Sequence, residues 1–171
     1  MEKKFRCIVT ERGENGKSFI SEDREVGVGP LGIIDFWETE EMPASLHGKN
    51  LLPGKPTRLE ASTHGTLFRF FEIPPFQKNL SPEEAEKQAA EVFASVQASH
   101  CRVDTRLNPM MHTTRTIDYV VLLKGEVTLL LDKSEVKLKP FDVVVQRGTN
   151  HYWINYNTEP ALLMGVLLDA K

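Results

Sequence analysis

The feature that most constrains the fold is a series of six short apolar segments between Ile117 and Leu168. Turn residues such as Lys-Gly, Asp-Lys, Lys-Pro and Arg-Gly separate one segment from the next. The six segments read IDYVVLL, VTLLL, EVKLK, DVVVQ, YWINY and ALLMGVLL. Short strands at such even spacing predict an antiparallel meander or a barrel. Because these strands are rich in leucine and poor in charge, we expect both of their faces to be covered.

The first 80 residues predict strands and loops that precede this barrel. Phe5–Thr10 alternates apolar and polar residues, an Asn-Gly turn follows at 15–16, and Ser18–Ile20 returns, so we expect a hairpin. Ile33–Trp37 and the aromatic-rich Thr66–Ile73 are further strand candidates. The polar stretch between them contains prolines and glycines, which predicts a long surface connection.

One segment has helical character. Ser81, Pro82 and Glu84 form a capping-box sequence with proline at the first helical position. Apolar residues behind it recur at helical spacing and fall on one face: Ala85, Ala89, Val92, Phe93 and Val96. We expect a helix from about Pro82 to Gln97 that packs this face on the sheet.

Length and composition indicate one globular domain. The chain has 171 residues, of which 40% are hydrophobic and 26% charged, and this is enough to form a core without disulfides. We expect a single domain over 1–171, with N-terminal strands and loops over 1–80, a helix over 81–100 and the barrel core over 105–171.

Charge and cysteine usage exclude several classes of partner. The net charge is −3, and lysines and arginines are scattered rather than clustered, so we expect no nucleic acid partner. Cys7 and Cys101 lack CxxC spacing, so we expect reduced, inert thiols. The N-terminal sequence shows no signal-peptide pattern, and the longest apolar run has only eight residues. We therefore expect a cytoplasmic protein without a membrane segment.

A candidate metal site follows from strand parity. His112 and Asp118 point to the same face if the segment between them is extended, and His151 follows a turn at 147–150. Two histidines and a carboxylate suit a divalent transition metal with open coordination positions, and Fe, Mn, Zn and Ni all accept these donors. The alternative is that His151 and Asp118 pair with each other without a metal.

The stretches "HTTRTIDYVVLLKG" and "RGTNHYWIN" resemble the two sequence motifs of the cupins. His112, Asp118 and Gly125 fall on the first motif, and Gly148, His151 and Asn155 fall on the second. The resemblance implies a mainly β fold, a cupin-type antiparallel β-barrel (jelly roll) with an N-terminal strand extension. It also implies the metal ligand set His112, Asp118 and His151.

The chain departs from the family pattern at four positions. Thr114 replaces the second histidine, Asp118 replaces a longer glutamate, Gln146 replaces a proline, and Phe141 replaces a glycine. The versions H-x-T-x-T-x-D-Y and V-V-V-Q-R-G-T-x-H-x-W are similar to those of one subgroup of small single-domain cupins. Some fungal members of that subgroup are associated with secondary-metabolite pathways.

Three residues beside the predicted ligands are candidates for substrate binding. Trp153 shares the face of His151. We expect it either to line a pocket for a flat ligand or to belong to the core. Thr114 and Asn155 are expected to contact substrate or to orient the ligands, with the alternative that Asn155 caps a turn.

Other charged and imidazole side chains carry weaker predictions. We expect Arg147, in the turn, either to bind an anionic substrate or to be solvated. We expect Arg115 at the surface or in a dimer contact. We assign no role to three histidines that lack a second donor at metal spacing: His47, His64 and His100.

The resulting hypothesis is a metal-dependent cupin enzyme that acts on a small organic molecule, such as an aromatic or polyketide-like acid. The reaction would be a decarboxylation, an isomerisation or a dioxygenation, with Asp118 as a catalytic base. The alternative is a non-catalytic metabolite-binding or sensory cupin that has lost its metal. We also expect a homodimer, because the N-terminal segments can add strands to their own sheet or to that of a partner.

Overall fold

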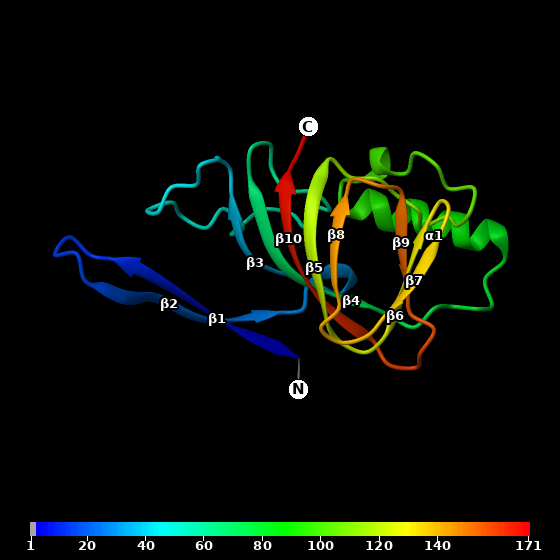
Figure 1. Cartoon of the computed structure of the whole chain (residues 1–171), viewed down its shortest axis with the longest axis horizontal. Coiled ribbons are helices and arrows are strands. Elements are labelled where there is room, and N and C mark those ends of the chain that lie inside the picture. The colour runs from blue at the N-terminus through cyan, green and yellow to red at the C-terminus, as the bar shows by residue number, and fades with distance from the viewer. Residues whose placement is uncertain (1–2) are drawn as a thin grey trace.

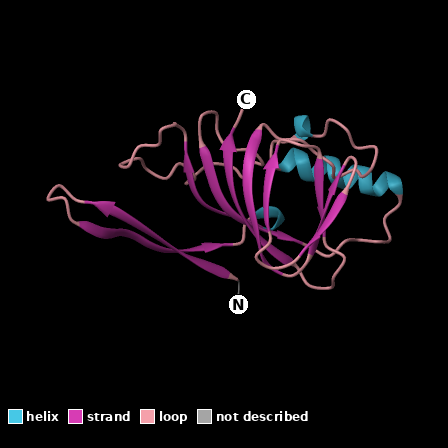
Figure 2. Ribbon diagram, in the orientation of Figure 1, coloured by secondary structure: helices cyan, strands magenta, loops and turns pink. Residues whose placement is uncertain are grey.

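The computed structural model describes residues 3–171 and shows a mainly β molecule with one α-helix, as predicted (Figures 1 and 2). A five-stranded sheet, a three-stranded sheet and a separate two-stranded hairpin make up the β-structure. All strand pairs are antiparallel. The strands are β1 (Lys4–Arg12), β2 (Ser18–Gly27), β3 (Ile33–Thr39), β4 (Thr66–Ile73), β5 (Thr116–Lys124), β6 (Val127–Leu131), β7 (Glu135–Leu138), β8 (Val143–Arg147), β9 (His151–Ile154) and β10 (Ala161–Asp169). The helices are η1 (Pro30–Gly32), α1 (Pro82–Ser95) and η2 (Ser99–Cys101).

The six predicted apolar segments all form strands, β5 to β10, but their pairing is not a meander. The five-stranded sheet has the order β3-β4-β10-β5-β8, and the three-stranded sheet has the order β7-β6-β9. The chain therefore crosses between the two sheets after β5, β7, β8 and β9, which is a jelly-roll type of connection. The hydrogen-bonded ladders form two sheets and no closed barrel among residues 3–171.

The space between the two sheets is filled by apolar side chains. Residues of β5 alternate between buried and more exposed positions, so that Val120 and Leu122 face inward. They join Leu129, Trp153 and Leu163 in one buried cluster. Fully burying an aliphatic side chain of this kind contributes about 1.5–3 kcal/mol, and this cluster therefore fixes β5 relative to β9.

The outer face of the five-stranded sheet is partly bare, which corrects the expectation that both faces are covered. Tyr119 is 47% exposed, Val143 65% and Val145 54%. Tyr119 pairs with Val145 and Val121 with Val143 across β5 and β8, so the exposed apolar residues form one patch.

The predicted N-terminal hairpin is confirmed, and it projects from the body of the molecule (Figure 1). Strands β1 and β2 pair with each other and form their own sheet. At its base, Phe5 packs edge-on against Phe70 of β4 with ring centroids 5.4 Å apart, and Arg24 donates to the carbonyl of Phe36 over 2.7 Å. Farther along the hairpin, Phe19 and Ile20 are exposed.

Helix α1 begins with the predicted capping box. The backbone N–H of Glu84 donates to Ser81 Oγ (3.2 Å), and the N–H of Ser81 donates to the Glu84 carboxylate (2.8 Å). Its buried residues Ala89 and Phe93 lie on the predicted face. Phe93 shares a buried cluster with Cys101 of η2, and Leu59, Met110 and Ile33 pack against this cluster. Because only Ile33 comes from a strand, the helix packs largely on loops. No helix among residues 3–171 combines the length and apolar character needed to cross a bilayer.

Candidate functional site

Two histidines meet where the segment before β5 approaches β9. His112 and His151 form an isolated antiparallel bridge, in which the N–H of each donates to the carbonyl of the other over 3.0 and 2.9 Å. Their ring centroids are 4.2 Å apart. The structure thus brings together the two predicted histidine ligands, although 39 positions separate them in the numbering.

Each imidazole is oriented by a hydrogen bond at Nδ1. His112 Nδ1 donates to the carbonyl of Met110 (3.0 Å) and His151 Nδ1 to that of Thr149 (2.8 Å). This bonding assigns the proton to Nδ1 and the lone pair to Nε2 in both rings. Neither Nε2 atom is hydrogen-bonded to another residue within 3–171. A metal-binding histidine has this arrangement, with one nitrogen held by a carbonyl and the other free.

Burial keeps both rings neutral. It lowers the pKa of His151 to about 3, and the neighbouring His112 adds to this effect. The pKa of His112 is also lowered, chiefly by burial. Neutral imidazoles near pH 7 can bind a metal without first losing a proton. The donor chemistry of the pair therefore fits a divalent transition metal.

The sequence around the histidines explains their position. Gly148 has φ +57°, and a Cβ atom at this position would lie 2.7 Å from the carbonyl oxygen of Thr114. Only glycine permits this close approach of the β8–β9 turn to the segment that follows His112. Aromatic rings enclose the pair, with Phe93 of α1 5.0 Å from the His112 ring and Trp153 6.1 Å from the His151 ring, centroid to centroid.

Asp118 lies on the predicted inward face but apart from the histidines. It is 8% exposed, and its Oδ1 atom has no hydrogen-bond partner. Burial raises the pKa of Asp118 to about 6, while Thr116 and the charge of Arg69 oppose this rise. Among residues 3–171, Asp118 does not join His112 and His151 in a group whose ligand atoms all lie within 4.8 Å of one another. The metal-free alternative requires a hydrogen bond between Asp118 and His151, and these two side chains are not hydrogen-bonded to each other either.

A cleft of about 550 Å³ opens beside the inward-facing threonines. Thr114 and Thr116 line it, and the Thr116 hydroxyl donates to that of Thr114 over 2.9 Å. Arg115 and Arg147 also line it, both with exposed side chains. The cleft thus contains hydroxyl groups and two guanidinium groups, and the carboxylate of Asp169 also lines it.

Trp153 and Asn155 are both buried, and their contacts are structural. Trp153 belongs to the apolar core between the sheets. Asn155 donates from Nδ2 to the carbonyls of Ile73 (3.0 Å) and Glu159 (2.7 Å) and accepts from the N–H of Asn157 (2.9 Å). These bonds agree with the alternative expectation that Asn155 caps a turn.

Sequence reasoning missed one cluster of metal-binding side chains. Glu60, His100 and Cys101 have their ligand atoms within 4.8 Å of one another, which corrects the expectation that His100 has no second donor nearby. Cys101 is buried, as expected of an inert thiol, and burial raises its pKa to about 12. The adjacency of His100 and Cys101 was the available sequence signal, whereas nothing in the sequence marks Glu60 as their neighbour.

Part of the chain is similar to curated fungal proteins. It is 50% identical over 64 residues to the phomopsin biosynthesis cluster protein C' of Diaporthe leptostromiformis, which covers 36% of this chain and 34% of that protein. It is 46% identical over 65 residues to the oryzines biosynthesis cluster protein J of Aspergillus oryzae (37% and 36%). It is 42% identical over 65 residues to the cupin-domain-containing oxidoreductase srdD of Neurospora crassa (36% and 33%). The match thus spans about a third of the length of each relative.

Solved structures show only a distant likeness, and no protein-family model matches the chain. The cupin domain of Schizosaccharomyces pombe Cnp3 has a TM-score of 0.39 and 14% identity, covering 99% of this chain and 86% of that one. A cupin-2 domain protein of Shewanella frigidimarina has a TM-score of 0.34 and 10% identity, covering 59% and 68%. Likenesses of this size do not bear on function.

The sequence matches include several proteins named for their cupin domain. The two motif segments, which lie far apart in the sequence, meet in the structure through the His112–His151 bridge. Over about a third of its length the chain is thus similar to proteins named for a cupin domain, and its two-sheet antiparallel fold agrees with that similarity.

Proposed function

We propose that the protein is a metal-dependent cupin enzyme that acts on a small organic molecule. The observation that carries this proposal is the histidine pair, in which both Nδ1 atoms are fixed by carbonyls and both Nε2 atoms are free. Burying two imidazoles side by side costs free energy unless their free nitrogens gain a partner. A shared divalent cation is the partner that suits two neutral rings.

His112 and His151 would hold the metal, and water or substrate would fill the other positions. When bound, a transition metal of this kind supplies Lewis-acid or redox chemistry, and Fe, Mn, Zn and Ni all accept imidazole ligands. Asp118 would complete the ligand set only if the segment between His112 and Asp118 bent to bring its carboxylate to the pair. In its observed position it serves instead as a general acid or base, because a carboxyl with a pKa near 6 and an unpartnered Oδ1 can take up or release a proton near neutral pH.

The cleft beside Thr114 supports a small anionic substrate. Arg115 and Arg147 at its rim attract carboxylates, and the hydroxyls of Thr114 and Thr116 offer hydrogen bonds inside it. An aromatic or polyketide-like acid fits this combination. Relatives are named for phomopsin and oryzine biosynthesis clusters and as oxidoreductases, which favours an oxidative step over decarboxylation or isomerisation.

Metal analysis of protein purified without a chelator tests the proposal. We expect the His112→Ala and His151→Ala variants each to contain one equivalent less of transition metal than the wild-type protein. The matched control is His47→Ala, because His47 lies in an exposed loop and should not affect metal content. If the protein stays metal-free after growth with added Fe, Mn, Zn and Ni, the metal-dependent function is wrong.

A non-catalytic, metabolite-binding cupin is the second candidate. The observation that favours it is the separation of Asp118 from the histidine pair, which leaves only two close ligands among residues 3–171. For this function, small carboxylic acids should bind equally well to wild-type protein and to the His112→Ala variant, whereas Arg147→Ala should weaken their binding. Calorimetric titration distinguishes the two candidates.

We further propose that two copies of the chain form a homodimer. The apolar patch of Tyr119, Val143 and Val145 on the outer sheet lacks a cover, and the projecting hairpin exposes Phe19 and Ile20. Exposed apolar patches of this kind mark protein interfaces. A projecting arm and a bare sheet on the same chain can cover each other in a twofold pair.

A further inference from the structure

Three different metal-binding side chains converge at the side of the molecule that carries α1. The Nε2 atom of His100 lies 2.8 Å from Glu60 Oε2 and 3.5 Å from Cys101 Sγ. All three ligand atoms lie within 4.8 Å of one another, and within 3–171 no other group of three His, Cys, Asp or Glu residues does so. Imidazole, thiolate and carboxylate are the three side-chain ligands of zinc in proteins.

The geometry distinguishes a metal site from a catalytic relay. In a Cys-His-Glu relay, one ring nitrogen would face the thiol and the other would face the carboxylate. Here the same atom, His100 Nε2, faces both Cys101 and Glu60. The three donor atoms therefore surround one common point, which is what a bound cation needs and what a relay does not provide.

The distances also suit zinc. With Zn–S near 2.3 Å and Zn–N near 2.0 Å, tetrahedral angles place sulfur and nitrogen about 3.5 Å apart. The Sγ of Cys101 and the Nε2 of His100 already have a separation of 3.5 Å. The separation of Glu60 Oε2 from His100 Nε2, now 2.8 Å, would have to open by about 0.5 Å for both atoms to bind one tetrahedral zinc ion.

The three ligands are held by the fold. The Oε1 atom of Glu60 accepts the backbone N–H of Arg115 over 2.7 Å, which leaves Oε2 to point at His100. Glu60 follows Leu59, whose carbonyl accepts from buried Arg69 (3.1 Å). Cys101 lies in the apolar cluster beneath α1, and its N–H donates to Ala98 (2.9 Å).

The site is open to solvent on one side and connected to the motif segment on the other. The His100 side chain is 60% exposed, so a metal ion and a water ligand can enter there. On the inner side, the carbonyl of Cys101 accepts the N–H of Thr113 over 2.9 Å. Glu60 and Cys101 thus contact the backbone at Arg115 and Thr113, directly after His112.

We propose that Glu60, His100 and Cys101 form a zinc site, separate from the His112–His151 pair, which anchors the segment that leads from His112 into β5. The fourth ligand is water. Coordination replaces the proton of the Cys101 thiol, which passes to the solvent. Burial and the Glu60 carboxylate oppose the resulting thiolate, whereas the bound cation and the guanidinium of Arg115 favour it. This site does not depend on the proposed enzymatic function.

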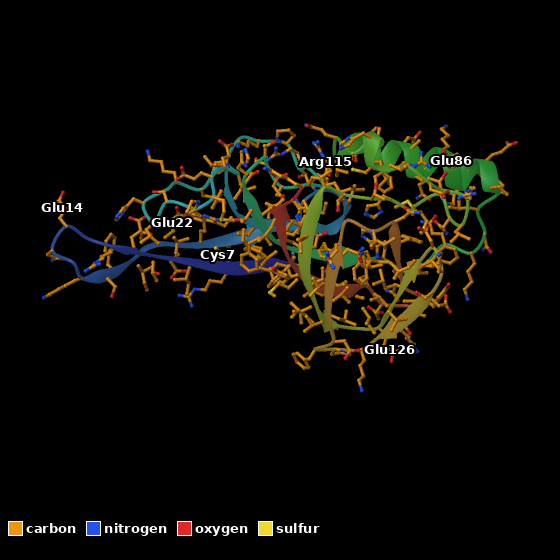
Figure 3. The ribbon with its side chains drawn as sticks, turned by 45° about the horizontal axis from the view of Figure 1, so that its top comes forward. Cys7, Glu14, Glu22, Glu86, Arg115 and Glu126 are labelled. Carbon is orange, nitrogen blue, oxygen red and sulfur yellow. The ribbon has the colours of Figure 1, made fainter. Side chains whose placement is uncertain are left out.

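Cobalt titration of reduced, chelator-treated full-length protein tests the proposal, because Co²⁺ bound by thiolate gives a charge-transfer band in the near ultraviolet. We expect this band to appear in the wild-type protein and to be absent in Cys101→Ser. Cys7→Ser is the matched control, since Cys7 lies on the hairpin, away from Arg115 (Figure 3), and it should retain the band. No band in the wild-type protein, or its retention in Cys101→Ser, overturns the proposal.

A second measurement does not require substitution of the buried cysteine. In a competition assay with a chromogenic chelator, His100→Ala and Glu60→Gln should weaken zinc binding at this site about tenfold or more. His47→Ala should leave the affinity unchanged, and unchanged affinity in His100→Ala refutes the site.

The His112→Ala/His151→Ala double variant separates this proposal from the proposed function. The histidine pair contains no thiol and therefore does not contribute to the cobalt–thiolate band. The double variant should keep this band while it loses metal from the histidine pair. Loss of the band in a double variant that keeps the wild-type circular dichroism spectrum would show that only one metal site exists and would overturn the second site.

Discussion

Arg69 and Asp35 form an ion pair on the inner side of β3 and β4, with Nε donating to Oδ1 over 2.8 Å. The same guanidinium donates to the carbonyls of Arg58 (2.7 Å) and Leu59 (3.1 Å), so it fixes the loop that carries Glu60. We predict that Arg69→Leu lowers the free energy of unfolding by about 3 kcal/mol, because it leaves a largely buried carboxylate and two carbonyls without their donor. Urea denaturation measures this loss.

Arg6→Leu is the control for the Arg69 experiment. Arg6 pairs with Asp23 in a comparable geometry, but on the exposed surface of the hairpin. Solvent screens such a pair, so the urea midpoint of this variant should equal that of the wild type. Equal losses in the two variants would show that Arg69 has no special structural role.

The stability of the chelator-treated protein should fall as the pH decreases from about 7 to 4. Burial lowers the pKa of His112 and His151 below the ordinary 6.5, so the unfolded state binds protons that the folded state does not. Asp118 acts in the opposite direction, since its pKa is about 6 in the fold against an ordinary 3.8. Each proton that the unfolded state binds in excess contributes a slope of about 1.4 kcal/mol per pH unit, and two histidines act against one carboxyl group.

Asp118→Asn tests the sign of this balance. The variant lacks the carboxyl that binds a proton in the folded state, so its stability should fall more steeply than that of the wild type between pH 6 and pH 4. Glu14→Gln, at the tip of the hairpin (Figure 3), should leave the slope unchanged. A shallower slope in Asp118→Asn, measured by urea denaturation at several pH values, would contradict the raised pKa of Asp118.

The elements of the fold could be predicted because their signals are local. The capping box at Ser81, the Asn-Gly turn of the hairpin and the period-two segments all specify backbone conformation within a few residues. The pairing of β5 with β10 and β8 could not be predicted, because it depends on contacts between segments far apart in the chain. For the same reason, the spacing of the segments left a meander and a barrel open, and the expectation of a jelly roll came from the family resemblance.

Strand alternation could predict which residues of the candidate site share a face, but it could not predict how far apart their side chains lie. Thr114, Thr116 and Asp118 are buried on one face, as alternation along a strand requires. An extended chain advances about 3.3 Å per residue, so six steps from His112 place Asp118 up to about 20 Å away. Parity therefore identified a shared face, but only a bend in the segment would bring both side chains to one metal ion.

Removal of the helix cap should weaken the protein modestly. Ser81→Ala deletes the side-chain acceptor for the N–H of Glu84, and the loss of an N-cap of this kind costs about 1 kcal/mol. The urea midpoint should shift accordingly. Ser134→Ala, in the exposed turn between β6 and β7, is the matched control and should have the wild-type midpoint. An unchanged midpoint in Ser81→Ala would mean that the first turn of α1 does not contribute to stability.

The bare apolar patch on the outer sheet predicts the effect of charge on assembly. Val145→Lys places an ammonium group at the centre of the patch formed with Tyr119 and Val143. Burying this charge in an interface is unfavourable, so the variant should sediment as a monomer at micromolar concentrations at which the wild type sediments as a dimer. Val136→Lys is the matched control, because Val136 is 46% exposed on β7 of the other sheet. If the wild type itself sediments only as a monomer, or if Val136→Lys dissociates it equally well, the outer face of the five-stranded sheet is not the dimer interface.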